Sequence, residues 1–374
     1  MVSMEELLNL MVQRGGSDLH LSVGSPPRIR VDGKLVDTEY EPLMPEAAKK
    51  LVYSVLGADQ VAKFEKNLEL DFSFGVANLG RFRTNAFIQR GTVAAVLRVI
   101  PFEVYDFETI GLPRKVCEWI CNLPRGLVLC TGATGSGKST TLASMINYIN
   151  EHDQGHIVTI EDPIEFLHRN KGCLVNQREV GGDTHGFEKA LKSVLRQDPD
   201  TVLVGEMRDL ETIEAALTLA ETGHLTFATL HTSDVAQTVN RIVDVFPAHQ
   251  QQQIRTMLSF TLQAIICQQL VPRQHGKGRA LAAEVMIANP AIRALIRDNK
   301  SHQIMSIIQT GAQVGMRTMN QSLFELYRQG VISYEDALDH SGDHADFERL
   351  MERAGGGAMS GQGMSRKGSG RRSR

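Results

Sequence analysis

The chain has 374 residues, of which 42% are hydrophobic and 22% are charged, and its formal net charge is −3. A chain of this length is too long for a single hydrophobic core, so we expect an ordinary globular protein of two domains with accessory segments. The small net charge gives no bulk electrostatic argument for nucleic-acid binding. Neither a secretory signal pattern nor a run of 18 apolar residues is found, so we expect no membrane span.

The predicted elements begin with an α+β region. Helical spacing of Leu7, Leu8, Met11 and Val12 predicts a first helix over 4–14. Short strands broken by Gly and Pro turns follow, and then a helical stretch near 45–66. Three strand-like runs come next, LDFSF, RFRTNAFIQR and VAAVLRVI. This order predicts a compact domain over 1–100, followed by a linker over 101–113.

From about residue 114 the pattern becomes that of an α/β protein. Apolar strand-like runs alternate with helices, which predicts a largely parallel sheet covered on both faces. The stretch 248–353 reads as mainly helical. The tail 354–374 consists mostly of Gly, Ser and basic residues and is expected to be disordered. Its basic residues suit anionic lipid or nucleic acid, but a solvated tail without function is the favoured interpretation.

The chain has five cysteines, an odd number, and no CxxC pair. We therefore expect no disulfide framework, and the cysteine content agrees with a reducing compartment. Cys117 and Cys121 lie four apart and could form half of a metal site on one helix face. No nearby His or Cys completes such a site, so we favour buried apolar roles for them.

A glycine-rich loop lies between a predicted strand and a predicted helix. The segment 132–139, GATGSGKS, satisfies the pattern GxxxxGK[ST] and follows the apolar run 127–130. Strand, loop and helix in this order form a phosphate cradle, in which backbone N–H groups and the helix N-terminus bind phosphate oxygens. We therefore predict nucleotide contacts from Gly132, Thr134, Gly135, Ser136, Gly137, Lys138, Ser139 and Thr140. Lys138 is expected to reach the β- and γ-phosphates, and the Ser139 hydroxyl to ligate Mg²⁺.

Hydrolysis also requires acidic residues, and two segments supply them. Glu206 lies just past the apolar run 202–204, as in a Walker B element, although a glycine precedes it. Glu161, Asp162 and Glu165 follow another strand-like run, and ligands bind at the carboxyl ends of such strands. The alternative is that these acids cap helices or pair with Arg208 or Arg169.

Two histidines flank the strand-like run 225–230. His224 precedes it and His231 follows it. A histidine at a strand end can reach a γ-phosphate or a carboxylate. Their spacing does not resemble a zinc pair on one helix, and purely structural roles remain the alternative.

Taken together and in this order, these motifs resemble the secretion-type hexameric ATPases. The segments are GATGSGKST, TIEDPIEF, NQREV, LRQDPD, VGEMRDLET, AETGHL and TLHT. Similarity extends over about 3–345, and AIRALIRDNK is similar to a motif typical of the retraction ATPases of bacterial type IV pili. Ala294 and Asp298 depart from that motif. Assembly ATPases usually carry a tetracysteine zinc element, which this chain lacks.

The resemblance implies a PAS-like N-terminal domain over 1–100 and a RecA-like ATPase domain over 114–353. It also implies residue roles: Lys138 and Ser139 match Walker A, Glu206 the Walker B acid and Mg²⁺ ligand, Glu165 the general base, and His224 and His231 the His box. Arg81 and Arg83 match N-terminal arginines that contact nucleotide. Being two apart in a strand, they share a face, which also fits a solvated basic surface.

The implied function is an ATP-hydrolysing motor for pilus retraction with ATP and Mg²⁺ as cofactors. The implied partners are other copies in a homohexamer, an inner-membrane pilus platform protein and a paralogous retraction ATPase, with a cytoplasmic location at the pilus base. An accessory retraction ATPase or a related secretion or DNA-transfer ATPase is the alternative. A nucleotide-sensing scaffold and a nucleic-acid-binding ATPase are less favoured, and no direct contact with nucleic acid is expected.

Overall fold

The computed structural model describes residues 2–77 and 79–353, so the predicted tail lies outside the described residues. The chain forms two compact units that each collect several segments. The first holds Met1–Asp106, Cys121–Gly126 and Ser139–Ala228, and the second holds Phe107–Ile120, Leu127–Lys138 and Thr229–Arg374. The predicted domain bounds, 1–100 and 114–353 with a linker over 101–113, stay a prediction.

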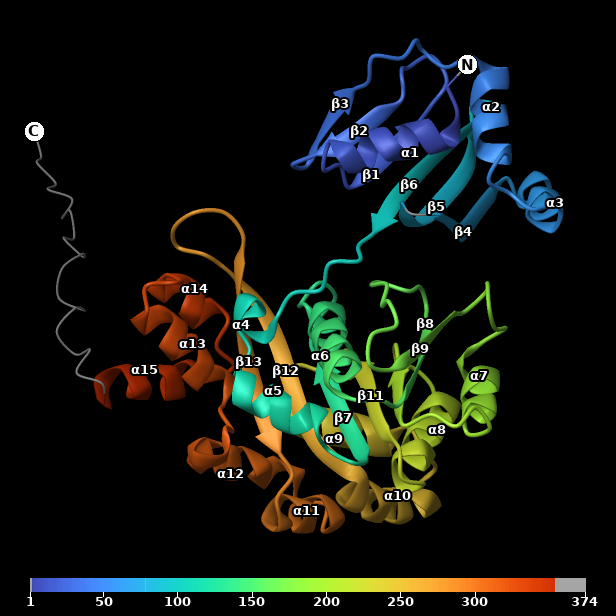
Figure 1. Ribbon diagram of the computed structural model, residues 1–374. Coiled ribbons are helices and arrows are strands. Elements are labelled where there is room, and N and C mark those ends of the chain that lie inside the picture. Colours follow the sequence, from blue (N-terminus) through green and yellow to red (C-terminus); the bar gives the residue numbers. More distant parts are fainter. Residues whose placement is uncertain (1, 78, 354–374) are drawn as a thin grey trace, which may run out of the picture. The chain divides into compact units, whose positions relative to one another are not determined.

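The first unit begins with a six-stranded antiparallel sheet in the order β3-β2-β1-β6-β5-β4 (Figure 1). Its strands are β1 (Asp18–Leu21), β2 (Arg28–Val31), β3 (Lys34–Asp37), β4 (Glu69–Val76), β5 (Gly80–Gln89) and β6 (Thr92–Ile100). The helices of this region are α1 (Met4–Gln13), α2 (Pro45–Tyr53) and α3 (Ala58–Asn67). Antiparallel pairing accounts for the alternation along β5, where buried and less buried residues follow one another.

Local sequence explains the helix boundaries of this sheet region. Ser3 and Glu6 form a capping box at the start of α1. The predicted helix over 45–66 is two helices, because Gly57 takes an extended conformation and caps α3. A buried apolar cluster that includes Leu8, Phe64 and Phe82 joins these helices to the sheet.

The first unit also contains parallel strands and their helices. β8 (His156–Glu161) pairs with β9 (Leu174–Glu179) and with β10 (Thr201–Val204), and β10 pairs with β11 (Leu225–Leu230). The helices are α7 (Phe187–Val194) and α8 (Leu210–Glu221), and α6 (Lys138–His152) follows the glycine-rich loop. Because β8 and β10 are parallel, the predicted acidic segments that follow them lie at the same edge of the sheet.

The second unit contains β7 (Gly126–Thr131), which pairs in parallel with β12 (Leu262–Pro272), and β12 pairs antiparallel with β13 (Arg279–Ile287). The seven-stranded sheet has the order β13-β12-β7-β11-β10-β8-β9. The α-helices of the second unit are α4 (Phe107–Ile110), α5 (Arg114–Cys121), α9 (Val235–Asp244), α10 (Ala248–Thr261), α11 (Pro290–Arg297), α12 (Ile304–Thr310), α13 (Met319–Arg328), α14 (Tyr334–Asp339) and α15 (His344–Arg353). This mixed α/β arrangement confirms the predicted fold class.

The prediction that 248–353 is mainly helical is wrong for the hairpin of β12 and β13. These strands are almost entirely buried and carry the apolar runs of 264–267 and 280–286. A continuous apolar run does not distinguish a buried strand from a buried helix by its period. Tertiary pairing with β7 decides the outcome here.

Candidate functional site

The glycine-rich loop joins the fully buried strand β7 to α6, as the sequence predicts. Gly132 has φ of 140°, and a Cβ there would lie 2.4 Å from the Gln268 carbonyl oxygen and 2.6 Å from Ser136 Oγ. Only glycine fits such a position. The close approach packs the start of the loop against β12.

Lys138 is the first residue of α6, and its ammonium is held over the loop. Its Nζ donates hydrogen bonds to the carbonyl oxygens of Gly132, at 2.8 Å, and Ala133, at 3.0 Å. The residue is only 9% exposed. A cation at a helix N-terminus, where the first N–H groups have no intrahelical partner, is a binding arrangement for phosphate.

Neighbouring side chains fix the loop and leave one polar group for a ligand. Cys130 Sγ donates to Gln268 Oε1 at 2.8 Å, and Arg279 Nη1 donates to the Gly135 carbonyl oxygen at 3.4 Å. Ser136 Oγ is buried without a hydrogen-bond partner among the described residues. An unpaired buried hydroxyl is costly, and a phosphate oxygen would satisfy it. The loop residues thus fit a nucleotide phosphate.

Glu161 ends β8 inside a hydrogen-bonded network. The Thr159 hydroxyl donates to its Oε1 at 2.6 Å, and Gln177 Nε2 donates at 3.3 Å. Burial raises the pKa of Glu161, and these hydrogen bonds oppose that effect. The buried carboxyl is therefore a less available base than an exposed one.

Glu165 lies beside this network but is exposed. Its backbone N–H donates to Glu161 Oε2 at 3.4 Å, so the two acids belong to one cluster. The sequence left both as candidates for the base. Gln177, which also donates to the Phe166 carbonyl oxygen at 2.8 Å, was not predicted to belong to it. The polar segment NQREV on β9 was the only signal for that residue.

Gly205 explains why the acid after β10 is preceded by a glycine. Strand pairing sets Val204 opposite Ile160. A Cβ on Gly205 would lie 3.2 Å from both the Glu161 Cα and the Ile160 carbonyl oxygen. The glycine therefore lets the ends of β8 and β10 approach, which places Glu161 and Glu206 at adjacent strand ends.

Glu206 contacts Arg208, the alternative partner predicted for it. Arg208 Nε lies 2.7 Å from Glu206 Oε1, and the side chain of Arg208 is 67% exposed. The carboxylate raises the pKa of Arg208. An exposed ion pair is weak and screened by solvent, so the pair does not prevent a metal-binding role for Glu206.

The two histidines lie at opposite ends of β11. His231 follows its carboxyl end and is exposed. His224 precedes its amino end, where Nδ1 lies 3.1 Å from the Leu219 carbonyl oxygen and its own carbonyl accepts from Gly126, the first residue of β7. The contacts of His224 therefore fix the end of α8, and a catalytic role for either histidine stays a prediction.

Arg81 and Arg83 point to the same face of β5, opposite the buried Phe82. Arg83 is exposed, whereas Arg81 Nη2 lies 3.6 Å from Glu179 Oε1 at the end of β9. Glu179 also accepts a hydrogen bond from the Ile164 N–H at 3.2 Å. Arg81 thus contacts the strand next to β8, and its contact with nucleotide stays a prediction.

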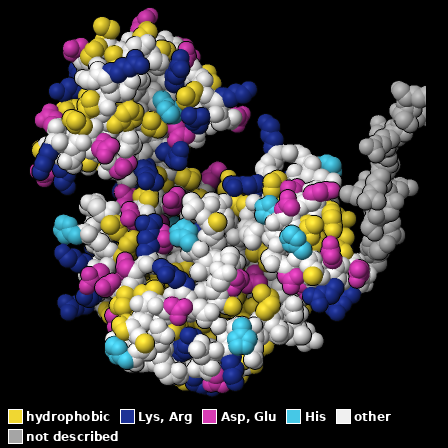
Figure 2. Space-filling model, turned by 180° about the vertical axis from the view of Figure 1, so that it is seen from behind, with side chains coloured by type: hydrophobic (Ala, Val, Ile, Leu, Met, Phe, Trp, Pro, Cys, Tyr) yellow, Lys and Arg dark blue, Asp and Glu magenta, His cyan; other side chains and the backbone are white. Residues whose placement is uncertain are grey.

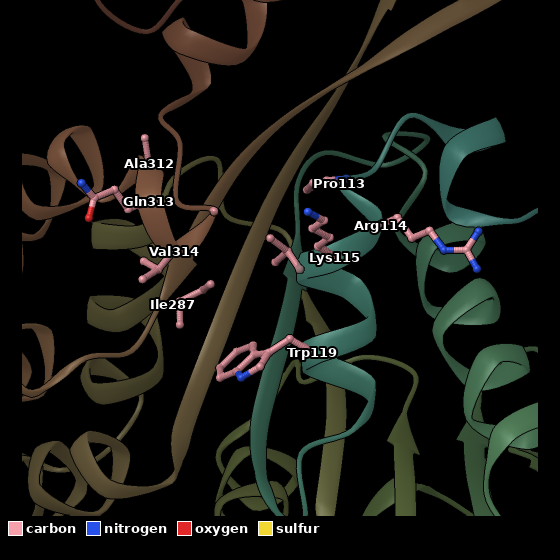
Figure 3. Close-up of a pocket in the computed structure, with 10 residues that line it drawn as sticks. Pro113, Arg114, Lys115, Trp119, Ile287, Ala312, Gln313 and Val314 are labelled. Atoms are coloured by element: carbon pink, nitrogen blue, oxygen red, sulfur yellow. The ribbon is translucent and has the colours of Figure 1, made fainter.

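A further pocket of about 760 Å³ lies in the second unit between α5 and the segment before α13 (Figure 3). It includes Lys115, Val314 and Trp119, which is the single tryptophan of the chain and is 43% exposed. None of the phosphate-loop residues lines it. The pocket is therefore separate from the predicted nucleotide site.

The cysteines form no metal site in the described part of the chain. All five are buried thiols, and no cluster of three His, Cys, Asp or Glu residues suited to a metal ion is found among the described residues. Burial raises the pKa of Cys117 to about 12. The buried apolar interpretation of Cys117 and Cys121 is thus favoured over the half-site.

Known proteins resemble the chain over most of its length. A family model described as "Type II/IV secretion system protein" matches residues 3–339. The type IV pilus retraction ATPase PilT of Pseudomonas aeruginosa is 52% identical, with 89% of this chain and 96% of the relative covered. The type IV pilus ATPase PilU of the same organism is 45% identical, with coverages of 94% and 91%.

A comparison with solved structures identifies the same group of relatives. A crystal structure of the pilus retraction motor PilT with bound ADP matches with a TM-score of 0.86 and 51% identity, covering 93% of this chain and all of that one. The extent of these matches exceeds that of the phosphate loop and includes both sheets. The chain therefore belongs to the type II/IV secretion system protein family, within the branch that contains the pilus retraction ATPases.

Proposed function

We infer that this chain is an ATPase that converts ATP hydrolysis into the retraction of type IV pili. The observation that carries this inference is the phosphate loop with its bound Lys138 ammonium, in a chain 52% identical to a retraction ATPase. Identity is lower to PilU, at 45%, which favours the principal motor over the accessory one.

ATP binding is supported by the geometry of the loop and the start of α6. Lys138 supplies a positive charge within reach of the loop, and Ser136 supplies a buried hydroxyl. We propose that Ser139, in the first turn of α6, and Glu206 hold Mg²⁺. Mg²⁺ typically binds one or two protein oxygens together with phosphate oxygens and water, and it neutralises charge on the phosphates.

For the hydrolytic step, Glu165 is proposed as the general base. Its carboxylate is exposed beside the buried Glu161, so water can approach it. The proposed task is to accept a proton from the attacking water. Glu161 and Gln177 would hold the segment that carries Glu165, through the hydrogen bonds described above.

Assembly is proposed from the family as well. A ring of six copies, a platform protein of the inner membrane and a paralogous ATPase are the proposed partners. Among the described residues, no helix has the length and hydropathy needed to cross a bilayer. From the family, we propose peripheral contact with the inner membrane at the pilus base.

The face of the molecule in view does not favour nucleic-acid binding. Figure 2 shows Lys and Arg side chains interspersed with Asp and Glu side chains over the face in view. Duplex binding usually requires a clustered basic face. The net charge of −3 agrees with that interpretation.

The test of ATPase function is steady-state hydrolysis by the purified chain with Lys138→Ala. We expect a loss of at least about a hundredfold in kcat/KM, because the variant removes phosphate contacts in both the ground state and the transition state. Lys192→Ala is the matched control, since Lys192 is exposed and pairs only with Glu188 in the same helix. Hydrolysis by Lys138→Ala at the rate of the control would refute the proposal.

A further inference from the structure

Glu284 is a buried acid near the middle of β13, outside the residues that the sequence predicted as functional. It is 1% exposed, and its strand partner is the fully buried Cys267 on β12. A carboxyl in such surroundings is stable only if hydrogen bonds or charges compensate for its desolvation. Its hydrogen bonds therefore require an explanation.

The carboxyl of Glu284 lies near the starts of two helices. Val235, which begins α9, donates its N–H to Glu284 Oε1 at 3.0 Å. The backbone N–H of Met319, which begins α13, favours the charged form of the same carboxyl and so lowers its pKa. Helix N-termini have N–H groups without intrahelical partners and favour negative charge, so one acid acts on both helix starts.

These bonds complement the caps that each helix already has. Asp234 accepts from the Gln237 N–H at 2.8 Å, and Thr318 accepts from the Gln321 N–H at 3.1 Å. The caps serve N–H groups in the third helical position, whereas Glu284 serves the first. Glu284 therefore links the starts of two helices and does not replace their caps.

The segments that precede α9 and α13 connect this link to the predicted site. His231 lies four residues before Val235, in the short segment between β11 and α9. On the other side, Arg317 pairs with Val285 through both backbone hydrogen bonds, at 2.8 and 3.1 Å, next to Glu284 on β13. The start of α13 is therefore fixed to the same strand as the start of α9.

We propose that Glu284 is a positioning residue whose carboxylate holds the segment carrying His231, through α9, in register with α13. The proposal rests on the ATPase function inferred above. It assigns to Glu284 no contact with nucleotide. It predicts that loss of the carboxylate changes turnover while the phosphate loop still binds nucleotide.

The protonation of Glu284 gives the proposal a second readout. Burial, with a smaller contribution from Asp234, raises its pKa from 4.5 to about 7. Cys267 faces it from β12, and burial keeps the pKa of that thiol well above the ordinary value. Arg317, whose Nε donates to the Ala283 carbonyl oxygen at 3.0 Å, is the nearby cation on the segment before α13.

The raised pKa of Glu284 makes the stability of the folded state depend on pH. Between pH 4.5 and about 7, folded Glu284 retains a proton that the unfolded chain has lost. The folded state therefore loses stability as pH rises through this window. The ionised carboxylate attracts the N–H groups at both helix starts more strongly than the neutral acid does, so turnover should instead rise with pH.

The experiment compares the full-length protein with Glu284→Gln and Glu284→Asp, measuring ADP affinity, kcat, KM and Tm from pH 5.5 to 8.5. We expect Glu284→Gln to bind ADP normally but to lose about tenfold in kcat, because an amide keeps one acceptor and adds a donor. Its Tm should also lose the fall with pH seen in the wild type. Glu284→Asp keeps the charge on a shorter side chain, so it should lower kcat but retain the pH dependence of Tm.

Glu325→Gln, on the exposed side of α13, is the matched control and should leave kcat and its pH profile unchanged. Wild-type kcat and pH profiles in both Glu284 variants would overturn the proposal. If Glu284→Gln does not fold, the kcat of Glu284→Asp decides, and a wild-type value refutes positioning. Failure of the wild-type protein to hydrolyse ATP would instead refute the underlying ATPase function.

Discussion

Two neighbouring acids at the end of β8 have different environments, and this difference predicts different effects on turnover. Glu165 is exposed, and Glu161 is buried with hydrogen bonds from Thr159 and Gln177. We expect Glu165→Gln to bind ATP normally and to lose about 10²- to 10⁴-fold in kcat, the range for removal of a general base. Single-turnover hydrolysis together with a nucleotide-binding assay measures both. If kcat is unchanged, Glu161 becomes the next candidate for the base.

The two histidines of β11 should respond differently to substitution. His224 contacts the end of α8 through Leu219 and Thr222, so His224→Ala should lower stability by about 1 kcal/mol through lost hydrogen bonds. His231→Ala should leave stability within about 0.5 kcal/mol, because the residue is exposed, but should lower kcat. Denaturant unfolding and steady-state kinetics separate these effects. A large stability loss in His231→Ala would show that its role is structural.

Single residues were predictable from the sequence where their chemistry depends on local conformation. The phosphate loop requires glycines, a lysine and a following helix within eight positions, so the pattern indicates the geometry directly. The hydrogen bonds of Gln177 and Glu284 join segments far apart in the sequence, and no spacing reports them. An acid within the apolar run ALAAEVMI was nevertheless a signal for Glu284.

Among the elements, α11 shows how the structure divides a motif that the sequence treated as a unit. Asn289 caps this helix by accepting from Ile292 N–H at 2.9 Å, and Pro290 occupies its first turn. Ile292 and Ile296, which lie four apart on one face of this helix, are buried. Arg293 Nη1 donates to the carbonyl oxygens of Ser259 and Phe260 at the end of α10, at 2.7 and 3.0 Å. Arg297 is exposed.

This division predicts different effects for the two arginines. Arg293→Ala should destabilise the protein by about 1.5–3 kcal/mol, because it removes charged hydrogen bonds to carbonyl groups at a helix C-terminus. Arg297→Ala should leave stability and ATPase activity nearly unchanged but impair pilus retraction in cells. Thermal unfolding, ATPase rates and retraction of labelled pili test both. Normal retraction with Arg297→Ala would show that retraction does not depend on this arginine.

Elements were predictable where their period was clear. The amphipathic helices α1 and α9 and the alternating strand β5 follow from local patterns. β12 and β13 were not, because apolar residues fill nearly every position and pairing with β7 decides their conformation. The predicted helix near 45–66 is divided at Gly57, because the backbone of this residue is extended.

For the whole molecule, we predict that the N-terminal sheet contributes to catalysis. Arg81 lies 3.6 Å from Glu179 and Arg83 is exposed on the same face of β5. The double variant Arg81→Gln and Arg83→Gln in the full chain should retain ADP binding and lose at least about tenfold in kcat, since an arginine stabilises transition-state charge. Arg28→Gln, in an exposed pair with Asp37, is the control. Wild-type kcat in the double variant would show that these arginines are structural.

Retraction of pili in living cells tests the proposed function of the molecule most directly. In cells that lack the gene, labelled pili should extend but fail to retract. Expression of the wild-type chain should restore retraction, and expression of Lys138→Ala at an equal level should not. Normal retraction in the deletion strain, or full rescue by Lys138→Ala, would contradict an ATP-driven retraction motor.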